Sequence, residues 1–190
     1  MEIIKFTTTP HEDMVDITDQ VQDFIKTNRP KDGFITLQAT EKSLGVVLGD
    51  RDDPKFSKDY LTKLNKLMPK YDGMQFMGFT TASIKASFVS QSLSVIISNG
   101  SLVLGLHQGI LAVDFASTDK EQFLFINYTG TNLDENESPA INPLLAELND
   151  AAAAKELAIK EEEQRLIEEM RREYAQNHST ISGNKDFISE

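Results

Sequence analysis

The chain has 190 residues, 39% of them hydrophobic, and its 30 acidic and 19 basic residues give a net charge of −11. This length is enough for one well-buried domain with an appendage. The acidic balance argues against a nucleic-acid partner, because such binding relies on clustered Lys and Arg. The absence of cysteine excludes disulfides, thiol nucleophiles and zinc–thiolate sites.

Targeting and membrane signals are also lacking in the sequence. Residues 1–6 do not have the basic and apolar regions of a signal peptide. No run of residues approaches the roughly 20 consecutive apolar side chains that span a bilayer. We therefore expect a cytoplasmic protein without a membrane partner.

The first 50 residues alternate between strand-like and helix-like patterns. Residues 2–8 are rich in Ile, Phe and Thr and predict a strand. Thr18 is the expected N-cap of a helix that ends at residues 28–30. Apolar and polar residues alternate over 34–39, which predicts a half-buried strand, and a short strand is expected over 46–48.

An amphipathic helix is predicted over residues 54–70, with one apolar stripe and lysines on the opposite face. The sequence then becomes strand-like, with Ser, Asn, Gly and Asp turn signals between the segments. The expected strands are residues 84–89, 93–97, 102–104, 110–115 and 122–128.

These elements predict an α+β fold. Closely spaced strands with short turns favour an antiparallel, barrel-like β-sheet, on which the two helices pack. A long C-terminal α-helix follows, because residues 144–176 are dominated by the strong helix formers Ala, Glu, Lys, Leu and Arg. Residues 131–143, rich in Asn, Glu, Ser and Pro, are expected to form a linker, and residues 177–190 a flexible tail.

Apolar residues of the C-terminal helix recur at three-, four- and seven-residue spacings. This seam is close to a heptad pattern but is interrupted at Lys155 and at Glu162 and Glu163. The helix is therefore either a solvated spacer or a surface that packs on another protein. Its candidate partner-binding residues are Leu145, Leu148, Ala152, Ile159, Leu166 and Met170.

Several short motifs follow one another in a characteristic order over the first 130 residues. They are Phe6-Thr7-Thr8-Thr9, residues 15–22, Asp32-Gly33, Asp53-Pro54, Ile84-Lys85-Ala86-Ser87, residues 99–105 and Gln108-Gly109-Ile110. In this order and spacing, residues 1–130 resemble the YjbQ-like (secondary thiamine-phosphate synthase) family. The resemblance implies a compact α+β fold and a homotrimer with sites near the subunit interfaces.

The chain departs from this family at the positions of the presumed active site. Glu41 stands where the family has the histidine of a Pro-His-Thr-Thr motif, and Ser83 where it has a second histidine. His107 replaces a tryptophan before Gln-Gly. Two imidazoles suit metal ligation or proton transfer near neutral pH, whereas a carboxylate and a serine do not. The added helix also lies outside the resemblance.

The remaining candidate site residues follow from the resemblance and from their side chains. Glu41 and Asp50 are candidates for a hard cation such as Mg²⁺, and with His107 they are the candidate catalytic residues. The alternative for His107 is a purely structural histidine. The candidate ligand-binding residues are Ser83, Lys85, Gln108 and Gly109.

Each of these ligand-binding residues has a structural alternative. Lys85 is either a partner for a phosphate group or a strand lysine at a subunit contact. Gln108 and Gly109 match the family pattern, but a turn at a strand entrance also explains a glycine there.

Two functions remain open. The first is a non-catalytic, trimeric binding or assembly protein that contacts a protein partner through its C-terminal helix. The second is an enzyme acting on phosphorylated small molecules, similar to the family's thiamine-phosphate synthase activity. We favour the first, because both family histidines are replaced and the helix is an addition to the scaffold.

Overall fold

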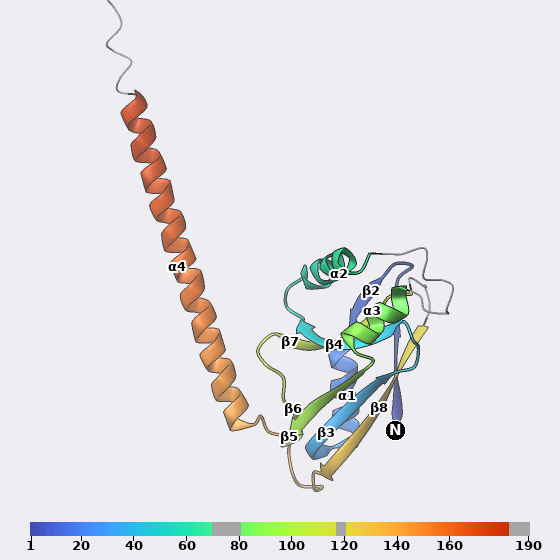
Figure 1. Ribbon diagram of the computed structural model, residues 1–190. Helices are drawn as coiled ribbons and strands as arrows, with labels where there is room; N and C mark the ends of the chain where they lie inside the picture. Colours follow the sequence, from blue (N-terminus) through green and yellow to red (C-terminus); the bar gives the residue numbers. More distant parts are fainter. Residues whose placement is uncertain (70–80, 117–120, 183–190) are drawn as a thin grey trace, which may run out of the picture. The chain divides into compact units, whose positions relative to one another are not determined.

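The computed structural model describes residues 1–69, 81–116 and 121–182 (Figure 1). The chain divides into two units, Met1–Ala146 and Glu147–Glu190. The first unit contains all the strands of the described residues.

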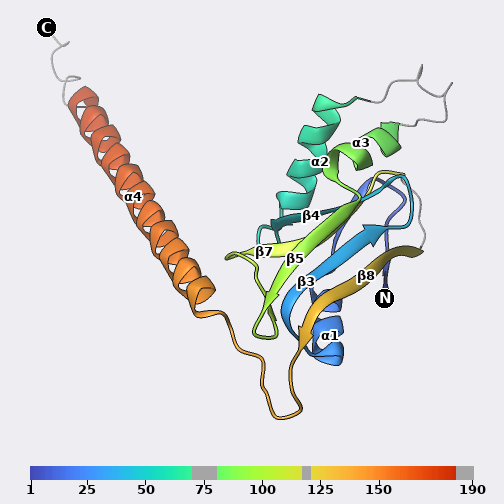
Figure 2. The ribbon, with the colours of Figure 1, turned by 60° about the horizontal axis from the view of Figure 1, so that its bottom comes forward.

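Two antiparallel sheets form the first unit (Figure 2). The five-stranded sheet has the order β1 (Glu2–Thr7), β8 (Glu121–Asn132), β3 (Pro30–Ala39), β5 (Ser92–Ser98) and β6 (Ser101–Leu102). The three-stranded sheet has the order β2 (Asp13–Asp16), β7 (Gln108–Asp114) and β4 (Leu44–Asp50). The predicted α+β class with a curled antiparallel sheet is confirmed.

The helix α1 (Thr18–Asn28) packs between the two sheets. Val21, Phe24 and Ile25 recur at helical spacing and are buried, so one face of α1 enters the main core. From the five-stranded sheet this core takes Ile4, Phe6, Ile35, Leu37, Val95, Ile97, Leu124 and Ile126. From the three-stranded sheet it takes Leu44, Val46, Ile110 and Ala112.

A second core lies on the opposite face of the three-stranded sheet, under α2 (Phe56–Leu67) and α3 (Thr81–Val89). Alternate residues of a strand point to opposite faces. Ile110 and Ala112 of β7 therefore enter the main core, while Leu111 and Val113 enter the second. Every residue of β7 from Gly109 to Asp114 is buried.

The strand expected over residues 84–89 is wrong, because this segment belongs to α3. Its Ile, Phe and Val favoured a strand, but a helix that packs against β4 and β7 can be apolar over much of its surface. The small residues Ala82, Ser83 and Ala86 fit this close packing, and Ala86 is fully buried.

Two local predictions near the start of α1 also need correction. Thr18 is the first residue of the helix and does not cap it with its side chain. Its hydroxyl instead donates to Asp16 Oδ1 at 2.5 Å and accepts the N–H of Ile110 at 2.8 Å. The short strand β2 was not predicted, because its four residues carry acidic side chains at both ends.

The long C-terminal helix predicted over 144–176 is α4, which runs over Pro143–Ser182. The exposed ion pairs Glu156–Lys160 and Glu168–Arg172 lie along it, with N–O distances of 3.1 and 3.8 Å. Such i,i+4 pairs contribute only about 0.3–0.5 kcal/mol each. Among the described residues, none of the helices combines the length and apolar character needed to cross a bilayer.

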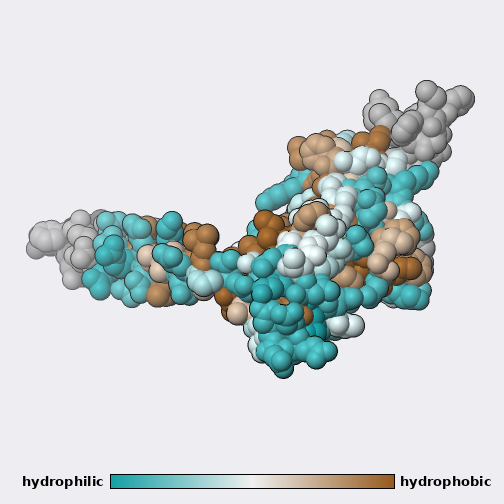
Figure 3. All heavy atoms as spheres, turned by 90° about the horizontal axis from the view of Figure 1, so that it is seen from below, coloured by the Kyte–Doolittle hydropathy of each residue, from teal (hydrophilic) through white to brown (hydrophobic). Residues whose placement is uncertain are grey.

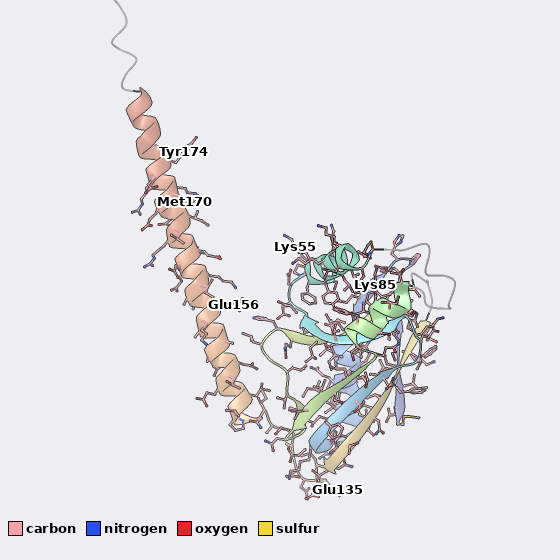
Figure 4. The ribbon with its side chains drawn as sticks, in the orientation of Figure 1. Lys55, Lys85, Glu135, Glu156, Met170 and Tyr174 are labelled. Carbon is pink, nitrogen blue, oxygen red and sulfur yellow. The ribbon has the colours of Figure 1, made fainter. Side chains whose placement is uncertain are left out.

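The second core contains a buried cation, Lys85 of α3 (Figure 4). The Lys85 side chain is 1% exposed and donates to Glu12 Oε1 at 2.8 Å and to Asn65 Oδ1. Its ammonium group also lies 5.8 Å from the centre of the Phe115 ring. Asn65 in turn donates to Glu12 Oε2 at 2.7 Å. This network joins the segment before β2, α2 and α3.

We predict that Lys85→Met lowers the free energy of unfolding by about 3–5 kcal/mol, because it leaves the Glu12 carboxylate without its counter-charge in a largely buried place. Urea denaturation of the full chain measures this change. The control is Lys58→Met, which replaces an exposed lysine of α2. Equal stability of the two variants would contradict a structural role for the Lys85–Glu12 pair.

Candidate functional site

The structure places the predicted site residues at opposite ends of the β4–β7 pair. The register runs from Leu44 opposite Asp114 to Asp50 opposite Gln108. Glu41 precedes the first end, whereas Asp50 lies at the second. At about 3.3 Å per residue, roughly 20 Å separates Leu44 from Asp50. Within one chain, Glu41 and Asp50 therefore do not come together around one cation.

At the second end, Asp50 shapes a turn. Its Oδ1 accepts the backbone N–H groups of Asp52 and Asp53 at 2.9 and 3.0 Å. The described residues contain no cluster of three or more carboxylate or imidazole groups suited to hold a metal ion. Asp50 thus acts in the structure as the acceptor that closes the turn after β4.

His107 lies beside this turn. Its Nδ1 is 2.6 Å from Asp52 Oδ2, and its carbonyl oxygen accepts the N–H of Arg51 at 2.9 Å. The side chain of His107 is 37% exposed, and its backbone is left-handed with φ of 64°. The contacts of His107 join the loop before β7 to the turn after β4.

Gln108 and Gly109 begin β7. Gln108 Oε1 accepts the N–H of Gly105 at 2.8 Å, which closes the loop before the strand. A Cβ atom at Gly109 would lie 2.9 Å from both Thr18 Oγ1 and Arg51 Cβ. Glycine at this position therefore allows the start of α1 and Arg51 to approach the strand closely.

The other end of β7 carries a buried polar network that the sequence did not reveal. Asp114 is fully buried; its Oδ2 accepts from Thr8 Oγ1 at 3.1 Å and from Gln122 Nε2 at 2.8 Å. Its Oδ1 accepts the N–H of Ala116 at 2.9 Å. The network joins the two sheets. An aspartate at the end of the apolar run 110–113 was the signal that could have found it.

Glu41 and Ser83 are the two positions at which the resemblance predicts replaced histidines. Glu41 lies in the exposed turn between β3 and β4, where its carbonyl oxygen accepts from Gln91 Nε2 at 3.4 Å. Ser83 is buried on α3, and its carbonyl oxygen accepts the hydroxyl of Ser87 at 2.9 Å. Lys85, two residues further along α3, is held by Glu12 and Asn65.

A pocket of about 570 Å³ lies along α1, and we call it the α1 pocket. Its lining includes Gln22, Ile25 and Lys26 of α1 and the C-cap residue Arg29. Gly100, Ser101, Leu102 and Leu104 also line it, as do Leu133 and Pro139. Arg51 and Gln108 are further lining residues. The sequence did not reveal this pocket, because its lining comes from four distant segments.

Leu133 and Pro139, the lining residues that follow β8, belong to the predicted linker. In the structure, hydrogen bonds tie this segment to the rest of the first unit. Leu133 donates its N–H to the carbonyl oxygen of Arg29 at 2.8 Å, and Ala140 donates to that of Asn99 at 2.7 Å. Lys31 pairs with the carboxylate of Glu137, and this hydrogen bond lowers the pKa of Glu137. These contacts give the pocket a fixed boundary.

The apolar residues predicted for partner binding are exposed along α4, apart from the half-buried Leu145. The side chains of Leu148, Ile159, Leu166 and Met170 are 54–67% exposed, and Ala152 is exposed as well. Figure 3 shows apolar residues among the polar ones along this helix. Leu157, Ile167 and Tyr174 add to the exposed apolar surface.

Comparison with known proteins gives consistent matches over the first unit. The family model described as "UPF0047 protein YjbQ-like" matches residues 2–131. UPF0047 protein MJ1081 of Methanocaldococcus jannaschii is 30% identical over 117 residues, which cover 61% of this chain and 85% of that protein. UPF0047 protein YugU of Bacillus subtilis is 30% identical over 117 residues, covering 60% of this chain and 89% of that protein.

Solved structures agree with these matches. An uncharacterised conserved protein of the YjbQ/UPF0047 family from Clostridium acetobutylicum has a TM-score of 0.63 and 26% identity, covering 68% of this chain and 100% of that one. A YbjQ-like protein of unknown function from Sulfolobus solfataricus has a TM-score of 0.61 at 21% identity, covering 68% and 95%, which bears on the fold alone. All of α4 lies beyond the residues that the family model matches.

We predict that Gly109→Ala lowers the free energy of unfolding by about 1–3 kcal/mol, because the new methyl group displaces Thr18 or Arg51 from β7. Urea denaturation measures the loss. The control is Gly105→Ala, whose methyl group would meet the movable end of Gln108 at 3.2 Å. A Gly109→Ala protein as stable as this control would show that the close approach is not needed.

Proposed function

Because the chain belongs to the YjbQ-like UPF0047 family, we propose that it is a homotrimeric binding or assembly protein built on that scaffold, which contacts a protein partner through α4. The observation that carries this proposal is the exposed apolar surface of α4, which lies outside the residues matched by the family model. These side chains are exposed to water in the single chain. A partner that covers them removes this apolar surface from water, which stabilises the complex.

The arrangement of the candidate catalytic residues also supports a non-catalytic role. By the resemblance, Glu41 and Ser83 stand where the family has histidines, whose imidazoles suit proton transfer near neutral pH. Asp50 closes a turn with its carboxylate, and Lys85 is committed to Glu12. The side chains needed for the family's presumed chemistry are thus absent or engaged in structural contacts.

The homotrimer is supported by the outer face of the five-stranded sheet. Phe34 and Ile96 are direct neighbours across β3 and β5, and their side chains are 43% and 61% exposed. Ile3 of β1 is likewise exposed, and it lies opposite Phe125 of β8. The helix α1 packs on the other face of this sheet (Figure 2). An apolar sheet face of this kind suits a contact between subunits.

The second candidate is an enzyme that acts on phosphorylated small molecules, similar to the thiamine-phosphate synthase activity associated with the family. The His107–Asp52 pair favours it, because a carboxylate that orients an imidazole is a common arrangement for proton transfer. The same contact also has a structural use in joining two loops, so we rank this function second.

We predict that the full chain sediments as a species of three times 21.3 kDa, and that Phe34→Glu with Ile96→Glu shifts it to the mass of one chain. Burying carboxylates in an apolar subunit contact costs more free energy than the contact contributes to association. Sedimentation equilibrium measures both masses.

The matched control for this variant is Leu67→Glu with Phe88→Glu, which alters two exposed apolar residues of α2 and α3. A trimeric Phe34→Glu/Ile96→Glu protein would place the subunit contact elsewhere. A monomeric unaltered chain would remove the homotrimer from the proposal.

For α4, we predict that Ile159→Ser with Met170→Ser reduces the affinity for the protein partner at least tenfold, since both side chains lie on its exposed apolar surface. The partner is first captured with the immobilised full chain from a lysate of the source organism and identified by mass spectrometry. Titration calorimetry with the purified partner then gives the affinities.

The matched control on α4 is Lys160→Ser with Arg171→Ser, which changes the neighbouring charged residues to the same side chain. The control should keep most of the affinity. Equal affinity of the two double variants would exclude the apolar surface of α4 as the docking element. A change in oligomeric mass in place of lost capture would identify α4 as a contact between subunits.

A further inference from the structure

The α1 pocket combines a size, an apolar lining and a charge that together indicate a ligand. Its volume of about 570 Å³ falls in the range of pockets that enclose small organic molecules. We propose that it binds a small amphipathic organic anion, with a carboxylate or phosphate monoester head and an apolar body. This site is separate from the protein contact proposed for α4.

The apolar body of the ligand follows from the aliphatic side chains of the lining. Ile25 of α1, Leu102 and Leu104 supply aliphatic surface, and Leu133 and Pro139 add to it after β8. Ile25 and Leu133 are themselves buried in the single chain, so these walls are fixed by packing. A lining of this kind stabilises an apolar group by removing it from water.

The charge of the ligand follows from the basic residues of the lining. Lys26, Arg29 and Arg51 line the pocket, and none of its lining residues in the described part of the chain is acidic. This composition contrasts with the chain as a whole, which has 30 acidic and 19 basic residues. A cationic lining on an anionic protein favours a ligand with negative charge.

The three cations differ in how far neighbouring carboxylates neutralise them. Arg51 lies 3.0 Å from Asp16 and 3.1 Å from Asp19, and the hydrogen bond with Asp19 raises the pKa of Arg51. Lys26 lies 2.8 Å from Asp23, whose hydrogen bond raises the pKa of Lys26. Arg51 and Lys26 are thus each already paired with a carboxylate.

Arg29 is different, because its side chain donates to neutral carbonyl groups. Its Nη2 donates to the carbonyl oxygens of Asp134 and Glu137 at 2.8 and 2.7 Å. The Glu137 carboxylate pairs instead with Lys31 and accepts the N–H of Asp134 at 3.1 Å. Within the described part of the chain, Arg29 forms no ion pair with a carboxylate, although its charge, after the contacts with Lys31 and Asp134, also helps to lower the pKa of Glu137. Its remaining N–H groups suit an anionic head.

The backbone also holds Arg29 in place at the end of α1. Its left-handed conformation, with φ of 47°, lets its N–H reach the carbonyl oxygen of Ile25 at 2.9 Å. Its own carbonyl oxygen accepts the N–H of Leu133 at 2.8 Å. A fixed guanidinium loses little freedom when a ligand binds. We place the head at Arg29 and the apolar body along Ile25 and Leu102.

The test uses the full chain and four probes with the same ten-carbon body. Decanoate and decyl phosphate are the anions, decanol is the neutral probe, and decyltrimethylammonium is the cation. Titration calorimetry should show saturable binding of an anion, and decanol and the cation should bind at least tenfold more weakly. The tighter anion identifies the head group. Absent or equal binding of the four probes would overturn the proposal.

A pair of matched variants tests whether the α1 pocket is the site. Gln22 and Gln20 are both exposed on α1, but only Gln22 lines the pocket. Gln22→Trp should reduce anion affinity at least tenfold by filling the space, and Gln20→Trp should leave it within about twofold. Equal affinities of these two variants would overturn the assignment to this pocket.

The charge is tested with Arg29→Gln, which should weaken the anion about tenfold or more and leave decanol unchanged. Arg172→Gln makes the same change of charge on α4, outside the lining, and should have no effect. Because Arg29 also holds residues 134–137, Lys26→Gln is measured as well and should weaken the anion selectively. If neither Arg29→Gln nor Lys26→Gln weakens the binding of the anion selectively, the anionic head does not lie beside Arg29 and Lys26. These outcomes do not depend on whether α4 binds a protein.

Discussion

The strand β7 is the element on which the rest of the first unit depends. It lies between β2 and β4, and its alternate residues enter both hydrophobic cores. The helix α1 is fixed to it at one point, where Ile17 donates to the carbonyl oxygen of Ile110 and Thr18 accepts the N–H of the same residue. Displacing β7 would therefore separate α1 from the sheet and open both cores.

The same strand explains why the candidate site residues do not form one site. Asp114 and its polar partners Thr8 and Gln122 lie at one end of β7, while Gln108 lies at the other. Since the strand between them is apolar and buried, polar groups gather only where it leaves the cores. The α1 pocket adjoins the Gln108 end, where α1 and the turn after β4 come close together.

Sequence patterns predicted the elements whose periodicity matches a single buried face. The alternation over residues 34–39 fits only a half-buried strand, which is β3. The spacing of Val21, Phe24 and Ile25 fits only a helix with one buried face, which is α1. The strand prediction over residues 84–89 was wrong because the apolar residues of α3 follow no clear helical period, although the segment is a helix. Lys85 was read as a ligand candidate, since its partner Glu12 is 73 residues away in sequence and no local pattern connects them. The α1 pocket likewise shows no local sequence pattern, because segments far apart in the sequence line it.

The two units of the chain obtain their stability in different ways, and this difference bears on function. The first unit is stabilised by the apolar residues of its two cores, although Ile3, Phe34 and Ile96 of its sheet stay exposed. In α4, ion pairs and helix propensity favour the helix. Its exposed apolar side chains contribute no free energy of burial until a partner covers them. Full burial of one such side chain contributes about 1.5–3 kcal/mol, of which association and side-chain ordering consume a part. A partner must therefore cover several residues of α4 at once, which favours a groove or a helical surface over a contact at a single point.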